Sequence, residues 1–424
     1  MRIKRVGLWI GICLIFLGTS FGIGFCNKEN IISQKEKLYE SLGIFTDTIS
    51  LIRSEYVDDV DPKDLICGAL KGMLSSLDPY SQFMDPDTYK EMKVSTEGEF
   101  GGVGIEISVR DNLLTVITPI VGTPAYEAGV KANDRILKID DETTRDITLI
   151  GAVKKLRGEA GSTVKISVLR EGAQKLLEFN IVRAIIKIES VKEPKVLKNS
   201  IGYIKLVEFQ EHSTKDFEDA LMNLENQNIK GLILDLRNNP GGLLNVAVEI
   251  SDFFLPEGKE IVSTKARDAQ QNLIFKSRKY PAHLDYPMVV LVNEGSASGS
   301  EIVAGALRDN KRAILLGTKT FGKGSVQTVI PLPDDSAVRL TTSKYYLPNG
   351  ECIHEQGIVP DVEVKEDDYV VRKEDDSIFD HIEESEVVDK KEEVYDVQLD
   401  RAVDLLKGLI AYKEYFSAGE EAKN

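Results

Sequence analysis

The stretch Pro287-Met-Val-Val-Leu-Val-Asn293-Glu-Gly-Ser-Ala-Ser-Gly-Ser300 joins a continuous apolar run to a turn of small residues. An apolar run of this kind is typical of a strand that is buried on both faces of a sheet. Apolar side chains at helical spacing then predict a helix over residues 301–308. A strand, a turn and a helix in this order predict an α/β core, with a side chain of the turn presented at the positive end of the helix.

Three serines in this turn, Ser296, Ser298 and Ser300, compete for the role of a nucleophile. The plain alternative for each of them is helix capping, which serine does very commonly. No histidine recommends itself as a partner, since His283 precedes the strand and the other histidines are scattered along the chain.

Lys323 lies 25 residues past Ser298, and a predicted strand at 313–316 returns the chain toward the serine turn. A lysine acts as a general base only when it is neutral, and a dry, apolar setting lowers its pKa. Gln327 follows four residues later. Because alternate residues of an extended run share a face, the Gln327 side chain can orient the Lys323 amine.

The same segment nearly matches a phosphate-binding loop. Residues 317–323 satisfy most of the pattern G-x-x-x-x-G-K-[ST], but residue 324 is glycine. A strand is predicted over 325–331, where a phosphate-binding loop requires a helix. Nucleotide binding is therefore disfavoured, and no cofactor is expected.

Residues 98–184 are rich in glycine and short β-type runs. The segment Phe100-Gly-Gly-Val-Gly-Ile-Glu-Ile107 places three glycines before a strand, where successive backbone N–H groups can form an anion-binding nest. Thr123-Pro-Ala-Tyr-Glu-Ala-Gly129 and Asn133-Asp-Arg-Ile-Leu137 follow. This pattern resembles a PDZ domain, and the resemblance implies that a peptide C-terminus adds as a strand beside residues 104–107.

The same resemblance implies that the glycine loop holds the peptide carboxylate. The peptide-binding residues are accordingly predicted to be Gly101, Gly102, Val103, Gly104 and Ile105. Arg157, at the end of a predicted helix over 148–156, has two interpretations: a contact with ligand charge, or a solvated surface arginine.

Four motifs further along the chain resemble those of the C-terminal processing (tail-specific) peptidases. They are Leu234-Asp-Leu-Arg-Asn-Asn-Pro-Gly-Gly242, Val292-Asn-Glu-Gly-Ser-Ala-Ser-Gly-Ser-Glu-Ile302, Phe321-Gly-Lys-Gly324 with Gln327, and Gly357-Ile-Val-Pro-Asp361. The resemblance covers roughly residues 35–412 and implies an α/β (crotonase-like) serine protease core.

The resemblance also implies three catalytic side chains and three backbone N–H donors of an oxyanion hole: Ser298 as nucleophile, Lys323 as base, Gln327 as its orienting residue, and Gly299, Gly241 and Gly242 as donors. Gly299 stands where the family usually has alanine, which leaves a backbone N–H in place. Asp235 and Arg237 are predicted to form a buried ion pair with a structural role.

The N-terminus predicts export. Three basic residues precede an uncharged run over 6–25, which as a helix would span about 30 Å, the thickness of a bilayer's hydrocarbon core. The basic flank predicts a single-pass protein of the bacterial cell membrane, with its catalytic part on the extracytoplasmic side. A cleaved signal peptide is the open alternative, although no A-x-A-like site is present. A lipid anchor at Cys26 is disfavoured, because Phe25 precedes it where a small residue is needed.

The charge balance excludes one class of partner. The 424 residues include 53 basic and 69 acidic side chains, for a net charge of −16, which argues against nucleic-acid binding. Residues 365–395 alone hold 13 acidic and 5 basic side chains, typical of a solvated linker. Cys67 and Cys352 lack C-x-x-C spacing, so no metal site is predicted.

The predicted fold class is multidomain α+β. Its segments are a membrane anchor or signal segment (1–27), a helical N-terminal domain (28–97), a PDZ domain (98–184), a Ser/Lys protease core (185–364), an acidic linker (365–395) and a C-terminal helix (396–424). The share of helix outside the core is compatible with a homodimer.

Two functions from different classes follow. The first is an extracytoplasmic serine endopeptidase that recognises the C-termini of protein or peptide substrates through its PDZ domain and cleaves through a Ser/Lys acyl-enzyme mechanism. The second is a membrane-tethered PDZ scaffold with an inactive protease-like core. A Ser-His-Asp protease would normally place its PDZ domain after the protease and show a G-x-S-G-type turn, and neither feature is present.

Overall fold

The computed structural model describes residues 37–110, 113–145, 147–278, 283, 285–365 and 396–421. The chain divides into two compact units between Asp85 and Pro86. The predicted anchor over 6–25 lies outside the described residues, as do residues 366–395 of the predicted acidic linker. Among the helices that the structure describes, none is both long enough and apolar enough to cross a membrane.

The first unit is mainly helical. Residues 37–55 are helical and are followed by α2 (Pro62–Ser75) and the short strand β1 (Gln82–Met84). Asp61 caps α2, since its side chain accepts a hydrogen bond from the Lys63 N–H at 2.8 Å, and Pro62 takes the first helical position. The predicted start of this helix at Asp61-Pro62 is therefore confirmed.

The predicted helical segment 28–97 does not form one body. Its last helix, α3 (Pro86–Glu97), belongs to the second unit. The physical reason lies in Asp85-Pro86, because a proline disfavours helix in the residue before it and can only open a new helix.

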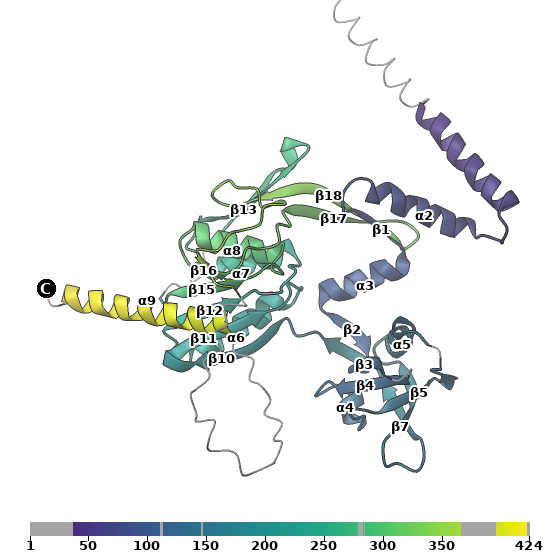
Figure 1. The fold of residues 1–424 in the computed structure, drawn as a ribbon, viewed down its shortest axis with the longest axis horizontal. Coiled ribbons are helices and arrows are strands. Elements are labelled where there is room, and N and C mark those ends of the chain that lie inside the picture. Colours follow the sequence, from purple (N-terminus) through teal and green to yellow (C-terminus); the bar gives the residue numbers. More distant parts are fainter. Residues whose placement is uncertain are drawn as a thin grey trace, which may run out of the picture. The chain divides into compact units, whose positions relative to one another are not determined.

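The segment predicted to be a PDZ domain forms a small antiparallel sheet covered by the helices α4 and α5 (Figure 1). Its main strands occur in the order β3-β4-β5-β7-β8, so that β3 stands at an edge. The elements are β2 (Glu99–Gly102), β3 (Ile105–Arg110), β4 (Leu113–Pro119), α4 (Pro124–Glu127), β5 (Arg135–Ile139), β6 (Glu142–Thr143), α5 (Leu149–Leu156), β7 (Thr163–Leu169), β8 (Leu177–Val182) and β9 (Ala184–Lys187). The antiparallel ribbon of β2 and β9 brings the first and last of these strands together.

The core contains a six-stranded sheet in the order β10-β11-β12-β15-β16-β19. All neighbours from β11 to β19 run parallel, and β10 is antiparallel to β11. The strands are β10 (Val191–Leu197), β11 (Ile201–Leu206), β12 (Gly231–Asp235), β15 (Met288–Val292), β16 (Ile314–Gly317) and β19 (Val362–Glu363). The predicted buried strand and α/β core are therefore confirmed.

Helices cover both faces of this sheet (Figure 1). One face packs against α6 (Ser213–Glu225), α7 (Leu244–Asp252) and α8 (Gly299–Asp309). Side chains alternate along each strand, so Leu232 and Leu234 of β12 face these helices while Ile233 faces the other side.

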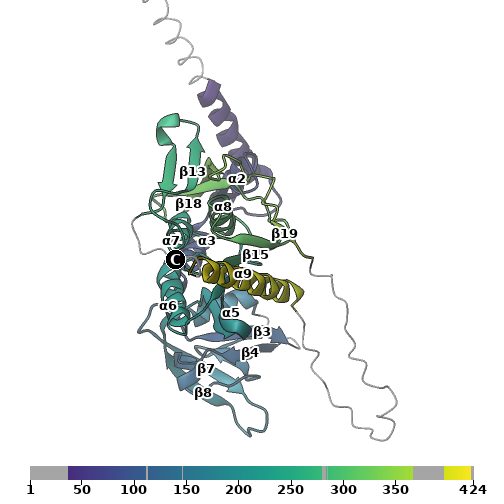
Figure 2. The same ribbon diagram turned by 90° about the vertical axis from the view of Figure 1, so that its left-hand side faces the viewer.

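The helix α9 (Val397–Glu421) packs against that other face, beside β12 and β15 (Figure 2). Ala402 and Leu406 of α9 are fully buried against the sheet. The helix runs on to Glu421, since the residues after Tyr412 include the good helix formers lysine, glutamate and alanine. A segment remote in the sequence thus completes the core.

A second, antiparallel sheet joins strands from several parts of the core. The hairpin of β17 (Ser325–Pro331) and β18 (Ala337–Tyr346) pairs through β18 with β13 (Glu260–Ala266), which pairs with β14 (Leu273–Lys276). A strand and not a helix follows Lys323, which removes the structural basis of a phosphate-binding loop.

Candidate active site

Three adjacent parallel strands end at one edge of the core sheet. The turn 236–242 follows β12, the serine turn 293–298 follows β15, and the loop 318–324 follows β16. Because the carboxyl ends of parallel strands meet at the same edge, the topology gathers these three loops, as is usual for the sites of α/β proteins.

The structure separates the three serines of the turn. Ser296 and Ser300 are fully buried, and their hydroxyls donate to backbone carbonyls, of Leu236 at 2.8 Å and of Asn239 at 2.9 Å. These two hydroxyls therefore hold the turn together. Ser298 retains 6% exposure at the start of α8, so it is the serine that the site presents.

The backbone of Ser298 adopts a conformation that residues other than glycine rarely take, with φ 52° and ψ −110°. Such strain costs on the order of 1–3 kcal/mol and persists where the surroundings enforce it. The arrangement resembles a sharp strand-to-helix corner that exposes a nucleophile.

Tyr345 of β18 lies against the serine. Its side chain is 4% exposed, and its backbone N–H donates to the Gly324 carbonyl at 2.8 Å, next to Lys323. Burial raises the pKa of Tyr345 to about 12, and a hydrogen bond with the Ser298 side chain opposes that rise. Tyr345 therefore stays a neutral hydroxyl in contact with the nucleophile candidate.

One buried carboxylate links the serine turn to the lysine loop. Glu301 is fully buried in the first turn of α8. Its Oε2 accepts hydrogen bonds from the backbone N–H of Ser298 at 3.0 Å and of Lys323 at 2.9 Å. Its Oε1 accepts from the Thr320 hydroxyl at 2.6 Å and the Gly322 N–H at 2.8 Å. The backbones of Ser298 and Lys323 are thus fixed to the same atom.

These four donors also bear on the protonation of Glu301. Burial raises the pKa of the carboxyl, and the four hydrogen bonds oppose that rise without cancelling it. Each carboxylate oxygen accepts two hydrogen bonds, so all four acceptor positions of the carboxylate are filled. If Glu301 were protonated, its own O–H would point at these donors and would find no acceptor. The geometry therefore favours the ionised form of Glu301 in spite of the burial.

Lys323 has the electrostatic setting that a neutral amine requires. Burial lowers its pKa, the positive charge of Arg339 on β18 lowers it further, and the Glu301 carboxylate raises it in part. The net direction is down. Burial, and after it the charge of Arg339, thus favour the neutral amine of this lysine.

The Gln327 side chain is fixed by Ser325. Its Nε2 donates to the Ser325 carbonyl at 3.0 Å and to the Ser325 hydroxyl at 2.7 Å. The amide nitrogen is therefore turned to Ser325, and the group available for an amine is Oε1. An amide oxygen can accept a hydrogen bond from a lysine amine. The lone pair of the amine nitrogen then points away from the amide.

The Gly241–Gly242 turn lies against the serine turn. A Cβ on Gly241, which has φ 103°, would lie 2.7 Å from the Ser298 Cβ and 2.8 Å from the Gly299 nitrogen, so only glycine fits. The Gly241 N–H donates to the Asn239 Oδ1 at 2.9 Å. Of the three predicted oxyanion donors, Gly241 is therefore engaged within its own turn.

Two buried asparagines join the neighbouring turns. The carbonyl of Asn239 accepts from the Ala297 N–H at 3.0 Å, and its Nδ2 donates to the Leu206 carbonyl at 2.8 Å. Asn293 Oδ1 accepts from the Asn238 N–H at 2.8 Å, and Asn293 Nδ2 donates to the Asn238 Oδ1 at 3.0 Å. The turn after β12 and the turn after β15 thus form one hydrogen-bonded body.

The Gly357–Asp361 motif supports the lysine loop from outside. The Ile358 N–H donates to the Thr320 hydroxyl at 2.7 Å, while the Thr320 N–H donates to the Ile358 carbonyl at 3.0 Å. Asp361 accepts from the Leu315 N–H at 2.8 Å. The motif therefore acts by holding Thr320, one of the four donors to Glu301.

The predicted peptide-binding residues surround the exposed edge of β3. Gly102, Val103, Gly104, Ile105 and Arg157 are among the residues that line a cavity of about 90 Å³ between β3 and α5. Gly101 lies within β2, outside this lining, and its carbonyl accepts from the Gly158 N–H at 3.0 Å.

Gly104 and Arg157 both contribute to the shape of this cavity. Gly104 has φ 77°, and its carbonyl accepts from the Ile120 N–H at 3.0 Å and the Thr123 hydroxyl at 2.9 Å, so it faces into the domain. The Arg157 guanidinium lies 4.2 Å from the centre of the Phe100 ring. Arg157 is thus held at the mouth of the cavity by a cation–π contact, in addition to being partly solvated.

Sequence reasoning did not find Glu301 or Tyr345. A signal for Glu301 was present, since Ser298-x-x-Glu301 has the S-x-x-E spacing of a capping box. Tyr345 carries no local signal, because strand pairing alone brings it to Ser298. Among the described residues, no group of three or more side chains is suited to hold a metal ion.

Three family models match parts of the chain. Residues 200–364 match the model of Peptidase family S41, residues 101–181 match that of the PDZ domain, and residues 21–88 match that of the Activating protease CtpB N-terminal domain. Among solved structures, a photosystem II D1 C-terminal processing protease is 31% identical, with a TM-score of 0.44 over 76% of this chain and 92% of that chain.

Two relatives match over most of their length. A carboxy-terminal-processing protease of Bartonella bacilliformis is 41% identical over 402 residues, which cover 90% of this chain and 92% of that protein. The carboxy-terminal processing protease CtpB of Bacillus subtilis is 39% identical over 345 residues, 81% of this chain and 69% of that protein. The chain therefore belongs to the carboxy-terminal processing serine proteases, with a family S41 peptidase core and a PDZ domain.

Proposed function

We propose that the chain is an extracytoplasmic serine endopeptidase that uses Ser298 as nucleophile and Lys323 as general base. The observation that carries the proposal is the shared hydrogen-bond acceptor: the backbone nitrogens of both residues lie within 3.0 Å of the Glu301 Oε2 atom. The lowered pKa of Lys323 supports the role of base, because a buried amine gives up its charge more easily.

The chemistry then follows in two steps. The Ser298 hydroxyl passes its proton to the neutral Lys323 amine as its oxygen bonds to the substrate carbonyl carbon, and the negative charge moves to the carbonyl oxygen. The resulting ammonium protonates the departing amine, which breaks the peptide bond and leaves an ester on Ser298. Water then gives a proton to the same amine as its oxygen bonds to the ester carbonyl carbon. The ammonium passes this proton to the departing Ser298 oxygen, which breaks the ester bond, restores the serine and releases the acid product.

Backbone donors stabilise the charge that forms on the substrate oxygen. We assign this role to the N–H groups of Gly299 and Gly242, since Gly299 opens α8 and the Gly241–Gly242 turn lies against it. Gln327 accepts a hydrogen bond from the Lys323 amine through Oε1, with its nitrogen fixed by Ser325. This arrangement points the amine lone pair toward the serine.

The alternative function is a membrane-tethered PDZ scaffold with an inactive core. A scaffold has no use for a buried carboxylate that carries four donors, or for a strained serine, since both cost stability. The hydrogen bonds around Ser298 and Lys323 therefore favour the enzyme.

Replacing either proposed catalytic side chain tests the mechanism. Ser298→Ala and Lys323→Ala should each reduce cleavage of an unfolded protein substrate at least 1,000-fold, as expected for a nucleophile and its base. Far-UV circular dichroism and thermal melting should show that both variants are folded. Lys319→Ala removes an exposed lysine of the same loop and should leave the rate unchanged. Activity retained in either of the first two variants would contradict the assignment.

The pH dependence of the rate tests the role of Arg339. The lysine must be neutral, so kcat should rise with pH through the lowered pKa of Lys323 and reach its plateau below the ordinary lysine range. Arg339→Gln removes a charge that lowers this pKa, so the midpoint of the kcat–pH profile should move upward by about one pH unit. Arg339→Lys keeps the charge and should restore the midpoint. An unshifted midpoint in Arg339→Gln would show that the arginine does not act on the base.

We further propose that the PDZ domain binds substrate C-termini. The support is the unpaired side of the edge strand β3, which lies beside a cavity lined by the Val103–Ile105 loop and α5. An extended peptide can pair with such an edge, and backbone N–H groups of the loop can hold its carboxylate.

Amidation of the substrate C-terminus tests this part separately. A peptide substrate that ends in a free carboxylate should have a KM roughly tenfold lower than its C-terminal amide, since one charge-assisted contact is lost in the amide. The rate at saturating substrate should differ less, because the cleavage site is unchanged. Equal KM values for the acid and the amide would contradict C-terminal recognition while leaving the Ser/Lys mechanism intact.

The location and assembly of the protein complete the proposal. The basic residues and the uncharged run at the N-terminus support a single membrane anchor, with the protease outside the cytoplasm. Several large apolar side chains of the helix at 37–55 are exposed, which supports a homodimer: Leu38, Tyr39, Leu42, Ile44, Phe45 and Leu51.

A further inference from the structure

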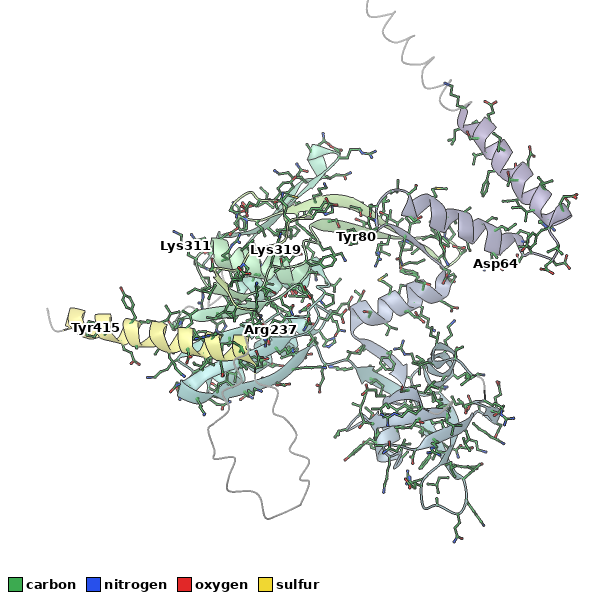
Figure 3. The ribbon with its side chains drawn as sticks, in the orientation of Figure 1. Asp64, Tyr80, Arg237, Lys311, Lys319 and Tyr415 are labelled. Atoms are coloured by element: carbon green, nitrogen blue, oxygen red, sulfur yellow. The ribbon has the colours of Figure 1, made fainter. Side chains whose placement is uncertain are left out.

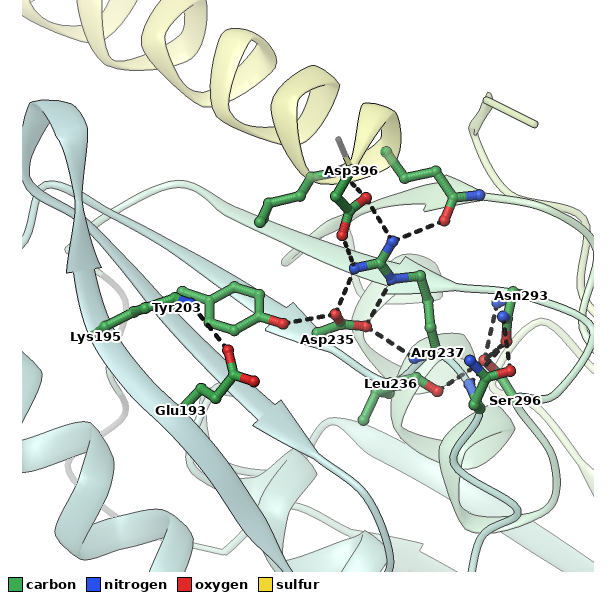
Figure 4. A network of polar contacts seen from close by, with 12 residues as sticks. Glu193, Lys195, Tyr203, Asp235, Leu236, Arg237, Asn293, Ser296 and Asp396 are labelled. Atoms are coloured by element: carbon green, nitrogen blue, oxygen red, sulfur yellow. Dashed lines mark hydrogen bonds and ion pairs between the residues drawn. The ribbon is translucent and has the colours of Figure 1, made fainter. Parts of the chain in front are cut away.

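Arg237 directly precedes residues 238–242, the part of the turn after β12 that carries Gly242, one of the two assigned oxyanion donors. All five guanidinium N–H groups of Arg237 are engaged (Figure 4). On one edge, Nε and Nη2 donate to the two oxygens of Asp235, at 3.0 and 2.7 Å. On the other edge, Nη1 and Nη2 donate to the two oxygens of Asp396, at 2.8 and 2.6 Å. Nη1 also donates to the Gln398 Oε1 at 3.0 Å.

Asp396 and Gln398 come from the other end of the chain, where α9 begins. Figure 3 shows Arg237 near the end of α9 that is opposite to Tyr415. The Asp396 side chain accepts from the Leu399 N–H at 3.0 Å, as a helix N-cap does. Gln398 Nε2 donates to the Val364 carbonyl at 2.8 Å. Burial raises the pKa of Asp396, but the Arg237 hydrogen bonds outweigh that effect and hold it below the usual range. The ion pair is therefore formed at neutral pH.

Charge alone does not explain the second carboxylate. Asp235 already neutralises Arg237, and its Oδ2 also accepts from the Tyr203 hydroxyl at 2.8 Å. Buried ion pairs as such add little to stability, because desolvation offsets the attraction. What Asp396 adds is a second bidentate contact, and two such contacts fix the plane and the position of the guanidinium.

The backbone of Arg237 is hydrogen-bonded within the same network, and its two neighbours in the chain contact the serine turn. The Arg237 N–H donates to the Asp235 Oδ1 at 3.0 Å, so the backbone is anchored by the same network. On either side of Arg237, the Leu236 carbonyl accepts from the Ser296 hydroxyl and the Asn238 N–H donates to Asn293. Any shift of Arg237 is therefore passed to the serine turn and to the Gly241–Gly242 turn together.

We propose that Asp396 and Gln398 are positioning residues for the cleavage reaction: by clamping Arg237, the first turn of α9 sets the geometry of the 238–242 turn. The inference rests on the function proposed above, in which Gly242 stabilises the oxyanion. Such donors must lie within a few tenths of an ångström of their productive place, so a small displacement lowers the rate of the chemical step without weakening substrate binding.

Asp396→Asn is the sharpest test, because asparagine is also a good helix N-cap and has the same size. Its amide nitrogen would face guanidinium donors and break one of the two contacts. With a peptide substrate, we expect kcat to fall about tenfold and KM to change less than twofold. Hydrogen–deuterium exchange of the full chain should become faster at residues 238–243, and less so elsewhere in the core.

Glu414→Gln is the matched control. It breaks another contact between α9 and the rest of the core, the exposed Lys230–Glu414 ion pair of 2.8 Å. Glu414 lies about five helical turns along α9 from Asp396. This variant should keep the kcat, KM and exchange pattern of the unmodified protein.

An unchanged kcat in folded Asp396→Asn would overturn the proposal. So would a fall in kcat that simply follows a lower melting temperature, with no local change of exchange at 238–243, because that pattern shows a purely structural role. If Ser298→Ala were found to cleave normally, the proposed function would fail, but the exchange measurement would still decide whether the first turn of α9 positions the 238–242 turn.

Discussion

The site depends on one buried carboxylate. Glu301 is sequestered from water, and four N–H and O–H donors satisfy its two oxygens. Burying a charge costs free energy, so the loss of any one of these donors would destabilise the folded protein strongly. This demand fixes the backbone of Ser298 and the loop that carries Lys323 relative to each other, because both supply donors to the same group.

The remainder of the core serves to bring these donors together. Parallel pairing of β12, β15 and β16 delivers three loops to one edge of the sheet, and asparagine side chains join two of them. The Gly357–Asp361 segment holds Thr320, and the β17–β18 hairpin brings Tyr345 to the serine. The first turn of α9, which packs on the opposite face of the sheet from α8, reaches the same edge through Arg237.

Local pattern explains what could be predicted from the sequence. The apolar run over 287–292 and the small-residue turn after it identify the strand, the turn and the helix, which together predict an α/β core. The choice among Ser296, Ser298 and Ser300 rested on resemblance, because three serines in one turn look alike until their hydrogen bonds are known. The orientation of the Gln327 amide and the engagement of the Gly241 N–H are likewise set by neighbours, Ser325 and Asn239, that no spacing rule identifies.

Contacts between remote segments were beyond sequence reasoning. Arg237 and Asp235 were expected to pair, and they do, but their second partner lies 159 residues away in a helix that sequence analysis treated as a separate segment. The same holds for Tyr345 and for the register that places Arg339 near Lys323. Long-range pairing of this kind is decided by the packing of whole elements, so a single sequence does not contain a readable signal for it.

The central claim, that the Glu301 carboxylate holds nucleophile and base in register, is tested most directly by single-turnover kinetics of Glu301→Gln. The variant replaces one acceptor oxygen by a donor that faces N–H groups, so the Ser298 turn and the Lys323 loop should move apart by a fraction of an ångström or more. The account predicts an acylation rate roughly 100-fold lower in a folded protein whose PDZ domain binds a C-terminal peptide as before. An acylation rate within threefold of the unmodified protein would contradict it.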